Sequence, residues 1–168
     1  PVQIWYQLRN RIWCPRYRNL ASPAVDSSLR LSAPVVKPSS YDGGTFTFLN
    51  VSDTFTCWDD TRHGMLWAYN LNYMDWLLQE GMTFETGAFW IDRFIDTLAD
   101  NKVGLDPYPS ALRIINWIKF ISAHFDDIDS DRRKRWNDSL YSQYIYLSER
   151  LEYHLLGNHI LEDAYALF

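Results

Sequence analysis

From residue 61 onward, apolar side chains recur at the three- and four-residue spacing of amphipathic helices, in segments separated by short loops. This pattern predicts helices over residues 65–79, 85–100, 111–124 and 131–155, with a further helix beginning near Asn158. In the third helix we assign Ile114, Ile115, Ile118 and Ile121 to the buried face. The run Asp129-Ser130-Asp131 supplies an N-cap and a favourable acid for the fourth helix. Short loops favour antiparallel hairpins, which could form a bundle or an arc of an α/α toroid.

Residues 1–60 have a different character. A short helix over residues 2–13 is compatible with the sequence, and the Ser- and Pro-rich residues 21–40 predict an extended connection. After Gly43-Gly44, residues 45–51 begin by alternating polar and apolar side chains, and residues 54–58 follow a turn at 50–53, which predicts a small β-hairpin. The chain is therefore expected to be mainly α, with an N-terminal segment (1–60) followed by helical hairpins (61–168).

The aromatic content and the net charge limit the classes of molecule that the chain is expected to bind. Aromatic residues make up 17% of the chain, with 8 Trp and 11 Tyr, which suits both helix packing and stacking on sugars. A net charge of −5 argues against nucleic acid as the main partner, although a few cations in a cleft could still bind a polyanionic sugar. No stretch reaches the roughly 20 apolar residues of a membrane span. Cys14 and Cys57 give neither a metal-ligand spacing nor a disulfide framework, and the histidine spacing makes a metal site improbable.

The pair Asn158-His159 follows Gly157 and is expected in the first turn of a new helix or in a kink. Backbone N–H groups are unpaired at such a position and can help to bind an anionic group. Glu162, four residues further on, could orient the Asn158 amide. The alternative is that Asn158 only caps the helix.

Two further groups of residues could contact a sugar. Arg113, Asn116 and Trp117 share one helix face, where a guanidinium, an amide and an indole would suit an acidic sugar, or where Arg113 would merely stack over Trp117 at the surface. Trp67, Asn70 and Tyr73 also share a face, whereas Leu66, Tyr69 and Trp76 are assigned to the core. For any single ring of this second group, a place in the core is the competing interpretation.

Three segments together resemble the N-terminal region of heparinase II/III-like polysaccharide lyases. They are Trp67-Ala68-Tyr69-Asn70-Leu71-Asn72-Tyr73-Met74-Asp75-Trp76, Asp106-Pro107-Tyr108-Pro109-Ser110 through Arg113-Ile114-Ile115-Asn116-Trp117, and Glu152-Tyr153-His154-Leu155-Leu156-Gly157-Asn158-His159. Their order and spacing match the family from about Phe46 onward. The resemblance implies an incomplete α/α toroid followed by a C-terminal β-sandwich, and β-elimination at a uronic acid of an anionic polysaccharide without a redox or nucleotide cofactor.

By this resemblance, Asn158 matches the family's carboxylate-neutralising Asn, and His159 is its neighbour in the motif. The family's catalytic Tyr and a second His lie beyond Phe168, so we expect this chain to be part of a longer protein and to be inactive alone. The N-terminal run PVQIWYQLRN has no signal-peptide pattern, but the family implies a periplasmic or secreted location. Two alternatives stay open: a non-catalytic protein for carbohydrate binding or for capsule or exopolysaccharide biosynthesis with the same toroid, and a purely helical interaction domain.

Overall fold

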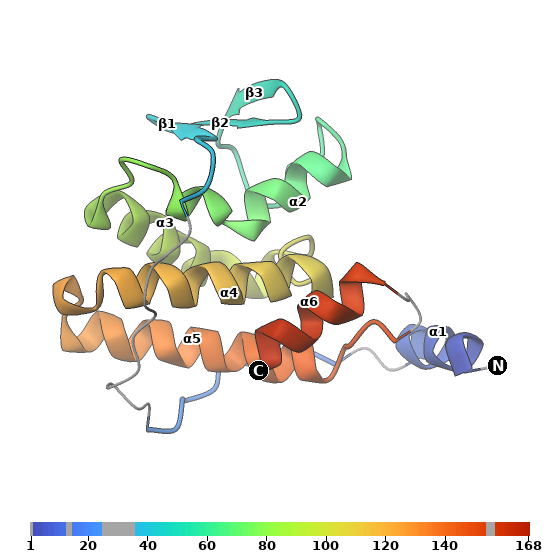
Figure 1. Cartoon of the computed structure of the whole chain (residues 1–168). Coiled ribbons are helices and arrows are strands. Elements are labelled where there is room, and N and C mark those ends of the chain that lie inside the picture. Colours follow the sequence, from blue (N-terminus) through green and yellow to red (C-terminus); the bar gives the residue numbers. More distant parts are fainter. Residues whose placement is uncertain (1, 13–14, 25–35, 154–156) are drawn as a thin grey trace.

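A computed structural model describes residues 2–12, 15–24, 36–153 and 157–168, which contain six α-helices and a three-stranded antiparallel sheet (Figure 1). The helices are α1 (Val2–Ile12), α2 (Met65–Tyr73), α3 (Phe84–Thr97), α4 (Pro107–Ala123), α5 (Ser130–Ser148) and α6 (Asn158–Leu167). Short 3-10 turns follow α2, α3 and α4, at Asp75–Leu78, Leu98–Asp100 and Phe125–Asp127. The prediction of a mainly helical chain with a small β element is confirmed.

The sheet has strands β1 (Tyr41–Asp42), β2 (Thr45–Phe48) and β3 (Val51–Thr54), in that order. Phe48 pairs with Val51, so the hairpin turn consists of Leu49 and Asn50 alone. Both turn residues have positive φ (55° and 62°), as a tight two-residue hairpin requires. The second strand therefore begins three residues before the predicted range 54–58, and the predicted turn at 50–53 is wrong.

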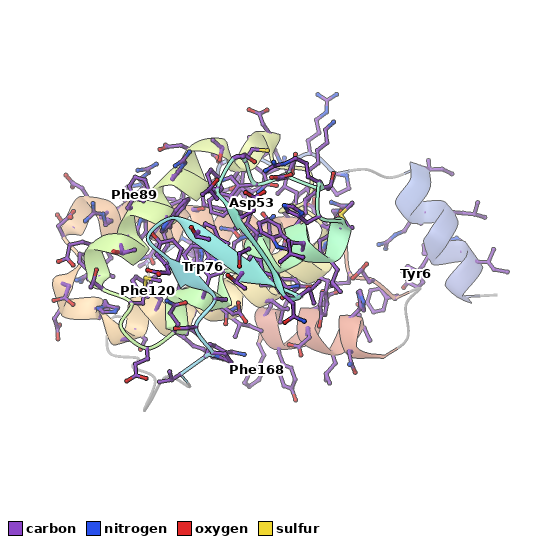
Figure 2. The ribbon with its side chains drawn as sticks, turned by 90° about the horizontal axis from the view of Figure 1, so that it is seen from above. Tyr6, Asp53, Trp76, Phe89, Phe120 and Phe168 are labelled. Carbon is purple, nitrogen blue, oxygen red and sulfur yellow. The ribbon has the colours of Figure 1, made fainter. Side chains whose placement is uncertain are left out.

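An aromatic core joins the sheet to the helices beneath it (Figures 1 and 2). Phe46 of β2 is fully buried, with its ring centroid 5.0 Å from that of Trp76 and 5.2 Å from that of Trp90, both edge-on. The side chain of Gln79 fixes β1, since it donates to the carbonyl of Tyr41 and accepts from the Tyr41 N–H. One hydrophobic cluster thus extends from the sheet through α2, α3 and α4 to α5.

The helix boundaries differ from the predicted ones at two places. The predicted helix 65–79 is interrupted after Tyr73, where Met74 adopts a left-handed conformation with φ 52° before a 3-10 turn. Helix α5 ends at Ser148, whereas the predicted end at Leu155 lies outside the described residues. Its predicted start is confirmed, because the Asp129 side chain accepts the Arg132 N–H at 2.8 Å.

The buried faces of α2 and α4 also differ from the prediction. In α4, Ile118 is 43% exposed, while Arg113 and Trp117 are fully buried. In α2, Leu66 is 55% exposed and Trp67 is 1% exposed. The assignment of Ile118 and Leu66 to the core is therefore wrong. In α4 the reason is that Arg113 and Asn116, on its inner face, form hydrogen bonds inside the molecule.

Helix α6 crosses α4 and α5, and α1 lies beside the end of this layer (Figure 1). The Tyr6 ring of α1 contacts the Tyr153 ring, with centroids 4.8 Å apart. Gly87 allows α3 and α4 to approach closely, since a Cβ atom there would lie 2.2 Å from Cζ of Phe120. Within the described ranges, no helix has the length and apolar character that a membrane crossing requires.

Candidate functional site

Asn158 and His159 are the first two residues of α6, as the sequence predicted for a new helix. Gly157 is the N-cap residue, with φ 122°, and no side chain caps the helix. Asn158 is exposed, and its side chain has no hydrogen-bond partner among the described residues. The alternative that Asn158 caps α6 is therefore wrong, and both its amide and the N–H groups of the first turn can face a ligand.

The His159 ring is held on two sides. Its Nδ1 lies 2.8 Å from Oε2 of Glu152, and its face stacks on Tyr108 with ring centroids 4.3 Å apart. The Glu152 side chain is 13% exposed and that of His159 is 41% exposed. Because a carboxylate only accepts hydrogen bonds, the Nδ1 atom of His159 carries a proton. In the neutral ring, Nε2 is then the nitrogen that can accept a hydrogen bond from a ligand.

Replacing Glu152 with glutamine is expected to change the tautomer of His159. A glutamine side chain at this position can donate as well as accept, so the imidazole proton is no longer confined to Nδ1. ¹⁵N chemical shifts of the ring would report a mixture of tautomers in E152Q and a single Nδ1-protonated tautomer in the unmodified chain at a pH where the ring is neutral. Glu149→Gln, at an exposed position, is the control and should leave the shifts unchanged. An unaltered tautomer in E152Q would contradict the role of Glu152.

Several carboxyl groups surround this pair. Asp163, further along α6, is completely buried, and its Oδ2 accepts the backbone N–H of Glu152 at 3.1 Å. Burial raises the pKa of Asp163 to about 6, and the charge of Glu152 also acts to raise it. The pKa of Tyr108 is raised as well, by burial and by the charge of Glu162. An anionic ligand would therefore depend on the Asn158 amide, the helix N–H groups and His159 to offset these negative charges.

A row of tyrosine rings leads from α2 to His159. Tyr73 meets Tyr108 edge-on with centroids 5.8 Å apart, and Tyr69 lies 6.3 Å from Tyr73. The Tyr69 hydroxyl donates to Oδ2 of Asp106 at 2.8 Å. Burial raises the pKa of both Tyr69 and Tyr73 above the ordinary value of 10, so both hydroxyls stay protonated near neutral pH. The Tyr73 hydroxyl can donate a hydrogen bond to a sugar, whereas the single O–H of Tyr69 is already donated to Asp106. Both hydroxyls are poor bases.

Of the predicted sugar-contacting residues of α2, only Tyr73 joins this row. Trp67 is buried against Phe48, with ring centroids 5.2 Å apart, and its Nε1 donates to the Val51 carbonyl at 3.1 Å. Trp67 is therefore a core residue, as the alternative interpretation of this group predicted. Asn70 is half-buried, and its Nδ2 donates to the Leu66 carbonyl of its own helix.

Arg113 is completely buried and cannot contact a ligand at the surface. Its Nε donates to Oε1 of Gln143 at 2.7 Å, and its guanidinium carbon lies 4.4 Å from the centroid of the Phe94 ring. Burial lowers its pKa to about 9, so the side chain keeps its charge at neutral pH. No carboxylate among the described residues forms an ion pair with it. The predicted surface stack over Trp117 is not formed, since Trp117 is buried as well.

Arg113 and Asn116 instead bind the C-terminal carbonyl groups of α2. Arg113 Nη1 donates to the Asn72 carbonyl at 3.3 Å, and Asn116 Nδ2 donates to the Tyr73 carbonyl at 2.9 Å. The last carbonyls of a helix lack partners within it and carry partial negative charge, so a buried cation is favourable there. Asn116 is 5% exposed. These two residues therefore cap α2 and position the tyrosines that it carries.

The structure brings together residues that sequence reasoning did not select as a site. Tyr108 and Glu152 were part of the quoted segments, but nothing in their spacing placed them against His159. Asp106 directly precedes α4, whereas Glu152 falls inside the predicted helix 131–155 and lies six residues before α6 begins. A polar residue just before a helix is a signal that could have marked Asp106, but no sequence signal marked Glu152.

A shallow, open pocket of about 410 Å³ lies elsewhere, between residues 19–20, α3 and α5. It is lined by Asn19, Leu20, Ile95, Asp131, Lys134, Arg135, Asp138, Ser139 and Ser142, and by none of the predicted site residues. Lys134 is paired with Asp138, and Arg135 with Asp92 and Asp96. Because its cations are already paired, this pocket is a weaker candidate than the start of α6.

Comparison with family models, curated proteins and solved structures finds no match to this chain.

Proposed function

We propose that this chain is the N-terminal part of a polysaccharide lyase of the heparinase II/III-like type, acting on an anionic polysaccharide that contains uronic acid. The observation that carries the proposal is the start of α6, where the Asn158 amide is free beside a histidine held by Glu152 and Tyr108. The order of the three sequence segments supports the same assignment. Asn158 and His159 are the proposed catalytic residues, and Tyr73 and Tyr108 the proposed sugar contacts.

The proposed reaction is β-elimination. A base removes the proton next to the sugar carboxyl group, the bond to the glycosidic oxygen breaks, and an acid returns a proton to the leaving oxygen. Negative charge grows on the carboxyl group as the proton leaves. The Asn158 amide and the uncapped N–H groups of α6 would stabilise that charge, because donors fixed in advance need no rearrangement during the reaction.

The proposal includes a toroid that continues beyond this chain. Leu161 and Tyr165 lie four residues apart on α6 and form an apolar stripe, since they are 50% and 61% exposed. Such a stripe is typical of a helix face that packs on another helix. We propose that helices from the C-terminal remainder of the same protein pack on this stripe. An α/α toroid needs such further helices.

The test is lyase activity of the longer protein on a panel of uronate-containing polymers, followed as absorbance of the unsaturated uronate product. We expect at least one polymer to be cleaved by the longer protein. This 168-residue chain alone is expected to give no turnover on the same panel, since Tyr69 and Tyr73 are held protonated and no base of the family type is assigned within it. If the longer protein cleaves none of the polymers, the proposal is contradicted. If the 168-residue chain alone shows turnover, the expectation that it is inactive by itself is contradicted.

Two observations favour the helical interaction domain instead. Arg113 is buried, so Arg113 and Asn158 share no cleft, and apolar residues are exposed on α1 (Ile4, Trp5, Leu8 and Ile12) as well as on α6. If this alternative holds, uronate oligosaccharides should leave the NMR signals of Asn158, His159 and Tyr108 unchanged. A non-catalytic sugar-binding protein would show those shifts without any cleavage by the longer protein.

A further inference from the structure

The guanidinium group of Arg93 lies over aromatic rings at the outer side of α3. Its carbon is 4.3 Å from the centroid of Phe55, 5.4 Å from that of Trp90 and 6.0 Å from that of Phe89. Contacts between a cation and ring faces restrict the long arginine side chain and leave the N–H edge of the guanidinium free. Arg93 is exposed, so this edge can reach a ligand.

No ion pair or hydrogen bond of the Arg93 side chain is found among the described residues. Its neighbours in the same helix are used differently. Asp92 accepts from Arg132, Arg135 and Trp136 of α5, and Asp96 accepts from Arg135. The acids one position before and three after Arg93 are therefore bound to α5, and Arg93 keeps an unneutralised charge.

Phe89 stands beside this cation with an open ring face. It is 56% exposed, while the neighbouring Trp90 is 3% exposed and supports it edge-on at 5.3 Å. In Figure 2, Phe89 lies away from Phe168, which stands at the end of the chain. An exposed aromatic ring can stack on the C–H face of a pyranose, and an adjacent guanidinium can bind a carboxylate or sulfate through two N–H groups.

We propose that Arg93, Phe55 and Phe89 form a second binding site, for a sugar ring that carries a carboxylate or sulfate group. Phe55 fixes the guanidinium, Arg93 binds the anionic group and Phe89 stacks on the ring. The site should prefer a charged saccharide to a neutral one. Both kinds of sugar can stack on Phe89, but only the charged one can form an ion pair with Arg93. This site contains no residue of α6 and does not depend on the proposed lyase activity.

The test is an NMR titration of the 168-residue chain with three probes: a uronate oligosaccharide, a neutral oligosaccharide of the same ring number, and inorganic sulfate. We expect the uronate oligosaccharide to shift the signals of Arg93 Nε and the Phe89 ring, with at least tenfold weaker binding of the other two probes. Arg93→Gln and Phe89→Ala should each weaken uronate binding at this site by about tenfold, the loss of one charge-assisted or stacking contact.

Two controls separate this site from the start of α6. Arg16→Gln removes an exposed arginine outside the patch and should change nothing, and Asn158→Ala should leave the shifts of Arg93 and Phe89 intact. Circular dichroism of each variant checks that the chain stays folded. Unchanged uronate binding in both R93Q and F89A, equal binding of sulfate alone, or shifts confined to α6 would each overturn the proposal.

Discussion

Replacing Arg113 with alanine is expected to destabilise the chain by about 3–5 kcal/mol, the range for truncating a large buried side chain that also donates hydrogen bonds. The substitution opens a cavity against Phe94 and leaves the Gln143 Oε1 atom and the Asn72 carbonyl without their donors. Each buried acceptor that loses its partner costs roughly 1–3 kcal/mol. The effect is large because the side chain is completely buried and water cannot replace the lost donors.

The measurement is the free energy of unfolding from urea denaturation, with circular dichroism as the probe. Since a loss of this size could unfold the chain, Arg113→Met is the second variant: it fills most of the volume and should be destabilising by less than R113A. Lys119→Ala, in the same helix but only half-buried, is the matched control, with an expected change within about 0.5 kcal/mol. A value for R113A as small as that of the control would show that Arg113 does not hold α2 to α4.

Arg113 also shows where sequence reasoning reached its limit. The spacing of Arg113, Asn116 and Trp117 correctly placed them on one helix face. That face was taken as the outer one because the isoleucines of the same helix were assigned to the buried face. Their partners are Gln143, thirty residues downstream, and the carbonyl groups at the end of α2, about forty residues upstream. Periodicity describes one helix at a time and contains no information on such distant partners.

Local signals were more reliable. Asp129 was recognised as an N-cap because a side-chain acceptor before a helix satisfies a free N–H of its first turn. The interruption of α2 at Met74 was missed because no glycine or proline marks it. Side-chain donors stabilise it instead: the Leu71 carbonyl accepts from the nearby Trp76, and the Tyr73 carbonyl accepts from Asn116 of α4. The new start at Asn158 was predicted from Gly157, whereas the contacts of His159 with Tyr108 and Glu152 depend on how α6 crosses α4.

Replacing Asn158 with alanine is expected to lower kcat/KM of the longer protein by about 100- to 1000-fold, the range for loss of one fixed donor to a developing oxyanion. The fold should be unaffected, because Asn158 is exposed and does not cap α6. Asn158→Asp should be more harmful than N158A. It adds a negative charge to a site that already contains Glu152 and Asp163, and it repels the carboxyl group that the amide would bind.

The rates are compared as initial absorbance of unsaturated uronate on the best polymer of the panel, with Asn19→Ala as the control for an exposed asparagine elsewhere. In the 168-residue chain, N158A should also weaken uronate binding at Tyr108 and His159 while the Arg93 signals respond as before. The order of the three rates is the discriminating result. If the Asn158 amide donates to the substrate carboxyl group, the unmodified protein should have the highest rate, N158A a lower rate and N158D the lowest rate. Equal rates for all three would remove Asn158 from the site. A rate of N158D equal to that of N158A would mean that the substrate carboxyl group does not lie beside this position.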